Sequence, residues 1–139
     1  MRRYCFFYSI KRMRSRISFI GLGQMGSPIV SRLVQKLPIH VWNRTHEKVR
    51  KQKLLNSANF KQMIPMALED MTNMEYVFTC LPSTTESGWI IRKLARQAKE
   101  CTTFVDLSSG CYQESVFIGQ DIYPHRYIDA PISGGPNGA

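Results

Sequence analysis

The feature that most constrains this chain is a glycine-rich turn, Gly21-Leu22-Gly23-Gln24-Met25-Gly26, which joins an apolar run to a helix-like segment. The apolar run covers residues 17–20, and a helix is predicted from Ser27 to Lys36. In such a strand–turn–helix unit the first glycine makes the tight turn, the second lets the backbone approach a pyrophosphate, and the third lets the helix pack closely on the strand. The N–H groups at the start of the helix then face the anion. The turn therefore predicts a dinucleotide-binding unit.

The rest of the chain alternates between short apolar runs and helical segments, a pattern that favours a parallel sheet. Strands are predicted at residues 17–20, 39–42, 76–81, 103–107 and 127–130. Helices are predicted at 27–36, 47–56 and 111–120, and another begins after a cap at Ser83 or Thr84. A length of 139 residues suits one domain. The predicted fold class is α/β, with a Rossmann-type, doubly wound, mostly parallel sheet in a single domain over residues 17–139.

The sequence also predicts which residues of two helices face the core. Residues 57–72 are ambiguous: one interpretation is a short helix with Met63, Met66, Ala67 and Met71, limited at its start by Pro65, whose methionines are core filler. The helix after Pro82 is predicted to turn inward Trp89, Ile90, Leu94 and Ala98.

The triplet Asn43-Arg44-Thr45 follows the second predicted strand and bears on the choice of cofactor. In many dinucleotide sites an acidic residue at this place accepts hydrogen bonds from the ribose hydroxyls and repels a 2′-phosphate. Here Asn43 is neutral, Arg44 offers a planar cation for phosphate and adenine, and Thr45 offers a hydroxyl donor. The triplet predicts a preference for NADP over NAD. The alternative is a plain helix start, with Thr45 as N-cap and Arg44 in solvent.

Two further strands are followed by loops of small polar residues. The strand over 76–81 stops at Pro82, which cannot donate to a sheet ladder, and the strand over 103–107 is followed by Ser108-Ser109-Gly110. Because ligands of open parallel sheets bind outside the carboxyl ends of the strands, both loops are predicted to face the glycine turn. Asp106 is interpreted as a cap or loop anchor and not as a catalytic acid.

The net charge of +9 is concentrated at the N-terminus, where residues 1–16 carry six of the 19 basic side chains and no acid. This basic segment resembles a mitochondrial presequence. A disordered leader is the alternative, and an arm for nucleic acid is the least favoured interpretation. The localisation, mitochondrial or cytoplasmic, is left open by the sequence.

The four cysteines form no CxxC pair and have no histidine partner at metal-ligand spacing, so no metal site is predicted. No apolar run approaches the roughly 20 residues that span a bilayer, so no transmembrane segment is predicted either.

Five ordered motifs resemble the N-terminal half of the β-hydroxyacid dehydrogenases. This family includes hydroxyisobutyrate dehydrogenase, phosphogluconate dehydrogenase, tartronate semialdehyde reductase, glyoxylate reductase and succinic semialdehyde reductase. The resemblance covers residues 17–139, and five motifs in order are far more specific than a glycine turn alone. The motifs are the glycine turn, Val41-Trp42-Asn43-Arg44-Thr45, Cys80-Leu81-Pro82, Val105-Asp106-Leu107-Ser108-Ser109 and Asp129-Ala130-Pro131-Ile132-Ser133-Gly134-Gly135.

The resemblance implies that the dinucleotide contacts the glycine turn, Asn43, Arg44, Thr45, Leu81, Pro82 and Ser109. It also implies that the carboxylate of a small hydroxyacid or semialdehyde substrate is bound by Ser133, Gly134 and Gly135. A hydroxyl and the N–H groups of a glycine pair suit a carboxylate. The implied reaction is hydride transfer at the hydroxyl-bearing carbon, with the hydride chemistry supplied by the cofactor. Full-length relatives are implied to be homo-oligomers.

The sequence departs from the family after the last motif. In relatives a catalytic lysine lies on a long helix beyond that motif, and a mostly helical C-terminal domain closes the cleft; here no lysine follows Lys99 before Ala139. No catalytic residue is therefore assigned, and the chain is expected to be inactive alone, since a missing general base costs about 10² to 10⁴ in rate.

The alternative function is a non-catalytic dinucleotide-binding or regulatory module. An apolar patch is expected near Ile132 and the last strand, with a tendency to associate.

Overall fold

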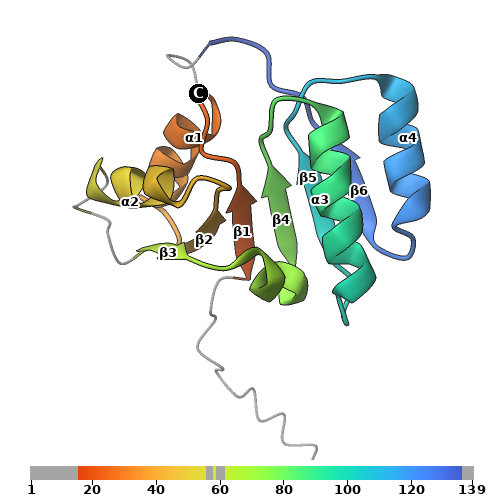
Figure 1. Cartoon of the computed structure of the whole chain (residues 1–139), viewed down its shortest axis with the longest axis horizontal. Coiled ribbons are helices and arrows are strands. Elements are labelled where there is room, and N and C mark those ends of the chain that lie inside the picture. Colours follow the sequence, from red (N-terminus) through yellow and green to blue (C-terminus); the bar gives the residue numbers. More distant parts are fainter. Residues whose placement is uncertain (1–15, 56–57, 59–61, 136–139) are drawn as a thin grey trace, which may run out of the picture.

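The computed structural model describes residues 16–55, 58 and 62–135. Within them lies one six-stranded parallel sheet with the strand order β3-β2-β1-β4-β5-β6 (Figure 1). The strands are β1 (Ile17–Ile20), β2 (Ile39–Trp42), β3 (Met63–Pro65), β4 (Tyr76–Thr79), β5 (Thr103–Asp106) and β6 (Arg126–Asp129). The chain begins at the centre of the sheet and winds outward first to one edge and then to the other, which is the doubly wound order of a Rossmann fold. The predicted fold class is confirmed.

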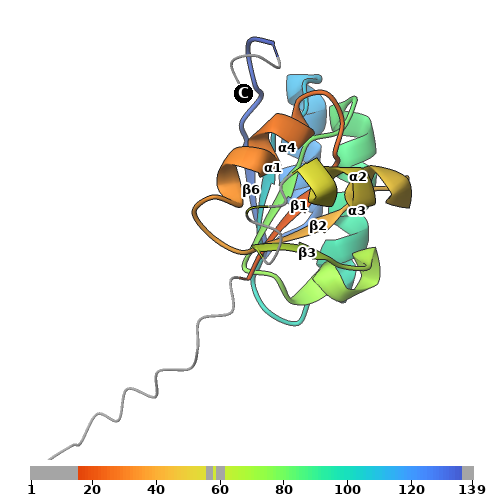
Figure 2. The same cartoon turned by 90° about the vertical axis from the view of Figure 1, so that its left-hand side faces the viewer.

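Helices cover both faces of this sheet, and α1 lies on the side opposite α3 (Figure 2). The helices are α1 (Gly26–Leu33), α2 (His46–Leu55), the 3₁₀ helix η2 (Leu68–Asn73), α3 (Thr84–Gln97) and α4 (Tyr112–Asp121). Two apolar clusters fill the space between the layers. One joins β1 and β2 to α1 and α2, and the other joins the sheet to η2, α3 and α4.

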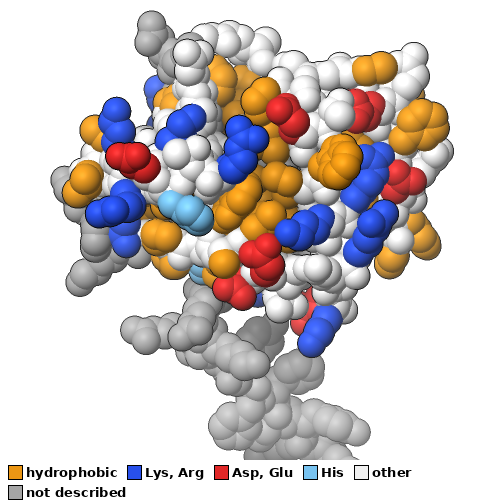
Figure 3. All heavy atoms as spheres, in the orientation of Figure 1, with side chains coloured by type: hydrophobic (Ala, Val, Ile, Leu, Met, Phe, Trp, Pro, Cys, Tyr) orange, Lys and Arg blue, Asp and Glu red, His pale blue; other side chains and the backbone are white. Residues whose placement is uncertain are grey.

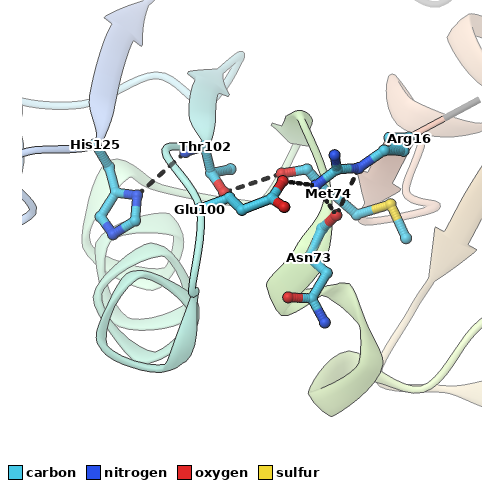
Figure 4. A network of polar contacts seen from close by, with 6 residues as sticks. All are labelled: Arg16, Asn73, Met74, Glu100, Thr102 and His125. Atoms are coloured by element: carbon cyan, nitrogen blue, oxygen red, sulfur yellow. Dashed lines mark hydrogen bonds and ion pairs between the residues drawn. The ribbon is translucent and has the colours of Figure 1, made fainter.

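The amino ends of the central strands are tied together by polar contacts (Figure 4). The Arg16 guanidinium donates from Nη2 to the carbonyl oxygen of Asn73 at 2.7 Å, which fixes the entry to β1 beside the entry to β4. The Thr102 hydroxyl donates to the Met74 carbonyl at 2.9 Å, and the Thr102 N–H donates to Nδ1 of His125 at 3.2 Å. These contacts align β1, β4, β5 and β6 at the edge of the sheet away from the glycine turn.

The segment around Met63 differs from the prediction. Met63–Pro65 forms β3, which pairs in parallel with β2 so that Met63 lies opposite Ile39, and a helix begins only at Leu68. The interpretation as a short helix was therefore wrong over its first half, although Met63 and Met71 are both buried as core filler. Pro65 is tolerated because β3 is the edge strand and needs no further ladder partner.

The inner face of α3 also differs from the prediction. Trp89 is 76% exposed, whereas Leu94 is buried and Ile90 lies half-buried beside the core. The buried stripe of α3 is Thr84, Ser87, Gly88, Ile91, Leu94 and Ala95. Small residues form its first half because the helix approaches α4 closely: a Cβ on Gly88 would lie 2.9 Å from the Ile118 side chain. The prediction that Trp89 faces the core was wrong, because it relied on apolar character and did not take into account the close packing between α3 and α4.

One face of the sheet beyond β4 carries apolar side chains in register. Phe78, Val105 and Ile128 lie opposite one another across β4, β5 and β6, on the face that carries α1. Val105 and Ile128 belong to neither apolar cluster, and Ile128 is 48% exposed. Parallel strands are ordinarily covered on both faces. At the last strand Ile128 is thus the exposed end of an apolar row whose other members are partly buried, and Ile132 is also only partly exposed; the expected patch stays a prediction.

We expect this surface to promote association of the chain. In sedimentation velocity the weight-average mass should rise with concentration, and Ile128→Asn should weaken that rise because it removes apolar area from the patch. Leu54→Asn is the matched control, since Leu54 is 73% exposed on α2 and is not part of this apolar row. Equal association by both variants and the parent chain would show that the patch is not involved.

Candidate functional site

The glycine turn lies where the winding of the sheet reverses, between β1 and its two neighbours β2 and β4. Gly21 has φ +104°, a conformation that favours glycine, and its N–H donates to the Trp42 carbonyl at 3.0 Å. A Cβ on Gly21 would lie 2.2 Å from the Cys80 carbonyl oxygen. Only glycine can therefore pass between the ends of β2 and β4 at this point.

The other two glycines of the turn have different surroundings. A Cβ on Gly26 would lie 1.9 Å from the Gly21 carbonyl oxygen, so α1 begins in direct backbone contact with the turn. A Cβ on Gly23 would meet nothing within 4 Å. The backbone at Gly23 is thus open to an incoming group, whereas Gly21 and Gly26 are closed by protein.

The start of α1 presents backbone N–H groups to that opening. Ser27 N–H donates to the Gly23 carbonyl at 3.1 Å, and its hydroxyl donates to the Leu22 carbonyl at 3.2 Å. The N–H groups of Gln24 and Met25 precede α1 and that of Gly26 is its first, and amides at such positions have no partner within the helix. Unpaired N–H groups at the positive end of a helix dipole are chemically suited to an anion.

Asn43 fastens the turn to the end of β2. Its side-chain oxygen accepts the Leu22 N–H at 2.9 Å, and its amide nitrogen donates to the Thr45 carbonyl at 3.1 Å. Both ends of the side chain are therefore used to hold the loops. Asn43 therefore fixes the shape of the site, and the Leu22 N–H is already hydrogen-bonded to it.

A cleft runs along the carboxyl ends of β1, β2, β4 and β5 and has two compartments that share Gly23, Cys80, Leu81 and Pro82. We call the first the serine compartment; its volume is about 330 Å³, and it is also lined by Gln24, Met25, Gly26, Leu107, Ser108, Ser109 and Ile132. The second, the arginine compartment, has about 210 Å³ and is also lined by Gly21, Trp42, Asn43, Arg44, Thr45, Lys48, Glu86 and Ile90.

The arginine compartment has a cationic wall and a largely apolar wall. Arg44, Thr45 and Lys48 come from the β2–α2 junction, while Pro82 and Ile90 come from the β4–α3 side. On the surface, hydrophobic side chains gather in a strip between α2 and α3, with basic side chains along it (Figure 3). Lys48 was missed in the sequence; it lies in the first turn of α2 and lines the compartment together with Arg44, which precedes the helix.

The serine compartment is held by hydroxyl groups. Ser108 Oγ accepts the Leu81 N–H at 2.9 Å and shares a 2.7 Å hydrogen bond with Ser87 Oγ, so the β4 and β5 loops are joined. The Ser109 carbonyl accepts the Thr84 N–H at 3.3 Å. Ser109 itself is exposed at the mouth of the compartment, where its side chain is available to a ligand.

Asp106 is a fully buried carboxylate beneath these loops. It accepts the Thr79 hydroxyl at 2.9 Å, the Ser108 N–H at 3.0 Å and the Tyr127 hydroxyl at 3.1 Å. Burial, with the nearby Asp106 charge, raises the pKa of the Tyr127 phenol well above its ordinary value. Asp106 is the loop anchor that its position suggested, and it lines neither compartment.

Cys80 lines both compartments but is poorly suited to nucleophilic chemistry. Burial raises the pKa of its thiol, and the negative charge of Asp106 raises it further. The thiol therefore stays protonated at neutral pH, whereas a reactive cysteine needs the thiolate.

The three residues of the predicted substrate site lie outside the cleft. Ser133, Gly134 and Gly135 are all exposed, and none lines either compartment, although Ile132 lines the serine compartment. Gly134 has φ +107°, and a Cβ there would meet nothing within 4 Å. Among the described residues no group of histidine, cysteine and acidic side chains could hold a metal ion, and no described helix is long and apolar enough to cross a membrane. The basic leader lies outside the described residues, except for Arg16.

Comparisons with known proteins agree with this geometry. Residues 16–139 match the family model described as the NAD binding domain of 6-phosphogluconate dehydrogenase. Mycobacterium tuberculosis 3-hydroxyisobutyrate dehydrogenase with L-serine is 25% identical, with a TM-score of 0.72 over 88% of this chain and 42% of that chain. Psf3 in complex with NADP+ and 2-OPP is also 25% identical, with a TM-score of 0.73 over 88% of this chain and 44% of that one.

A third similar structure is 6-phosphogluconate dehydrogenase of Plasmodium falciparum, at 19% identity and a TM-score of 0.74 over 88% of this chain and 28% of that chain. The chain thus spans less than half the length of each of these proteins. No curated protein sequence matches it.

The contrast between Gly26 and Gly23 can be tested directly. Gly26→Ala should lower the free energy of unfolding by about 2–4 kcal/mol, because its Cβ collides with the Gly21 carbonyl. Gly23→Ala should leave stability within about 1 kcal/mol, because the space around that Cβ is empty in the protein. Urea unfolding followed by circular dichroism measures both. Similar losses in the two variants would contradict the close packing at Gly26.

The raised pKa of Tyr127 predicts a loss of stability in alkali. In the unfolded chain the phenol ionises near pH 10, whereas the folded protein keeps it protonated to higher pH. The tyrosine thus stabilises the fold fully below about pH 10 and progressively less above it. Compared with Tyr127→Phe, the parent chain should lose more unfolding free energy between about pH 8 and 11 in urea titrations. Tyr112→Phe, at a 75% exposed position, should retain the parent's dependence.

Proposed function

We propose, from the premise that this chain belongs to the family of the NAD binding domain of 6-phosphogluconate dehydrogenase, that its cleft binds NADP(H) for an oxidoreductase of small β-hydroxyacids or semialdehydes. The observation that carries the proposal is the cleft itself, in which an open glycine turn joins a cationic compartment to a hydroxyl-lined one. The bound cofactor would supply the hydride chemistry, and the chain would bind and orient it.

The residues of the cleft suit one orientation of a bound dinucleotide. The pyrophosphate would lie at the open backbone of Gly23, where the first N–H groups of α1 converge. The adenosine half would occupy the arginine compartment, against Pro82 and Ile90, and the nicotinamide half the serine compartment, beside Ser109. Leu81 and Pro82 border both compartments and would contact both halves.

The end of β2 favours the phosphorylated dinucleotide. An acid at this place would repel a 2′-phosphate, but Asn43 is neutral and is engaged with the turn. Arg44 and Lys48 supply two positive charges on the same wall, and Thr45 supplies a hydroxyl. The similar structure of Psf3 contains NADP+, which supports the same preference here.

The last motif supports the proposed substrate class. The hydroxyl of Ser133 and the N–H groups of Gly134 and Gly135 would bind a carboxylate. The similar 3-hydroxyisobutyrate dehydrogenase was determined with L-serine, a small acid with a hydroxyl on its β-carbon. Because these three residues are exposed outside the cleft, we propose that they act once a further element brings substrate over the serine compartment.

Titration of the chain with NADPH and NADH, followed by nicotinamide fluorescence, tests the cofactor preference. NADPH should bind roughly tenfold or more tightly than NADH, since charge-assisted hydrogen bonds to the 2′-phosphate contribute about 1.5–3 kcal/mol. Arg44→Ala should remove most of the difference, and Lys48→Ala part of it. Arg50→Ala, an exposed position of α2 that does not line the cleft, is the control and should change nothing. Equal binding of the two dinucleotides by the parent chain would refute the NADP assignment.

A further inference from the structure

The arginine compartment contains one carboxylate among its lining residues, that of Glu86. It lies in the first turn of α3, on the wall opposite Arg44 and Lys48. Glu86 forms no ion pair with either cation among the described residues, since the ion pairs there join Arg16 to Glu100, Arg92 to Asp121 and Lys93 to Glu69. An anion in a compartment for a phosphorylated ligand is unfavourable unless it meets a hydrogen-bond donor of that ligand.

A capping interaction with Ser83 orients the Glu86 carboxylate. Ser83 Oγ donates to Oε2 of Glu86 at 2.8 Å and accepts the Glu86 N–H at 3.4 Å. This capping interaction uses one carboxylate oxygen, and Oε1 has no hydrogen bond within the described part of the chain. Glu86 therefore presents a free acceptor to the compartment, one helical turn before Ile90.

We propose that Glu86 selects the base of the dinucleotide by accepting a hydrogen bond from the exocyclic amino group of adenine, an inference that rests on the function proposed above. Arg44 and Lys48 hold the 2′-phosphate at the β2 wall, so the base extends toward α3. Ile90 and Pro82 supply the apolar surface on which its ring packs, and Glu86 meets its polar edge. Adenine offers a donor there, whereas hypoxanthine offers a carbonyl oxygen that a carboxylate repels.

Glu86 also caps α3, and Glu86→Gln separates the two roles. Glutamine serves as well as glutamate in the Ser-x-x-Glu cap, so the variant keeps the helix start. It removes the negative charge and places an amide at the same position, which can donate to the hypoxanthine oxygen as well as accept from adenine. Base selection should therefore fall while stability stays the same.

The test is the ratio of dissociation constants for NADPH and for its deamino form, which carries hypoxanthine, measured by nicotinamide fluorescence. The parent chain should bind NADPH roughly tenfold more tightly than the deamino form, as expected for a charge-assisted hydrogen bond. In Glu86→Gln the two affinities should agree within about twofold, with an unchanged thermal midpoint. Glu47→Gln is the matched control, because it makes the same charge change in the first turn of α2, outside the compartment, and should keep the parent's ratio.

Three other results would each overturn the inference. An equal ratio in the parent chain and in Glu86→Gln shows that Glu86 does not recognise the base, while the binding of NADPH itself still supports the proposed function. If Glu47→Gln also loses the preference for NADPH over the deamino form, the effect comes from net charge and not from the position of Glu86. If neither nucleotide binds, both the inference and the proposed function are wrong.

Discussion

The backbone contact between the glycine turn, the start of α1 and the end of β4 is the constraint on which the rest of the structure depends. A side chain at Gly21 would lie 2.2 Å from the Cys80 carbonyl oxygen, and one at Gly26 would lie 1.9 Å from the Gly21 carbonyl oxygen. Because β1 is flanked by β2 and β4, this contact sets the point from which the sheet is wound in both directions. The same contact leaves Gly23 uncovered, and so creates the opening of the cleft.

Polar side chains extend this constraint to the neighbouring loops. Asn43 binds the turn to the end of β2, Ser108 binds the β5 loop to the β4 loop, and Asp106 anchors Ser108 from below. Each of these groups is satisfied by protein partners, as buried polar groups must be. The loops around the cleft are therefore held by the protein itself, before any ligand arrives.

The sequence was sufficient to predict the elements whose signal is local. The bounds of β1 and β2 agree with the predicted strands, and the Ser83 cap of α3 is observed, since apolar runs and capping residues act over a few positions. It failed at Met63, where pairing with β2 outweighs the helical pattern, and at Trp89, where close contact between α3 and α4 selects small residues. Both outcomes depend on distant partners, which periodicity alone does not contain. The location of the cleft was predicted from the sequence. The positions of Lys48 and Glu86 in it were recognised only in the structure, where both line the compartment that Arg44 also lines.

The structure separates the residues that shape the cleft from those proposed to choose the ligand. Gly26 and Asp106 are buried and in close contact with protein, so changes there act through the fold. Arg44 and Lys48 are exposed, and exposed substitutions ordinarily change stability by only about 0.5 kcal/mol; Glu86 is also exposed but takes part in the cap of α3, which glutamine keeps. The proposed choice of phosphate and base can therefore change with little effect on the scaffold. The N–H groups proposed to face the pyrophosphate belong to the backbone and are kept whichever side chains surround them.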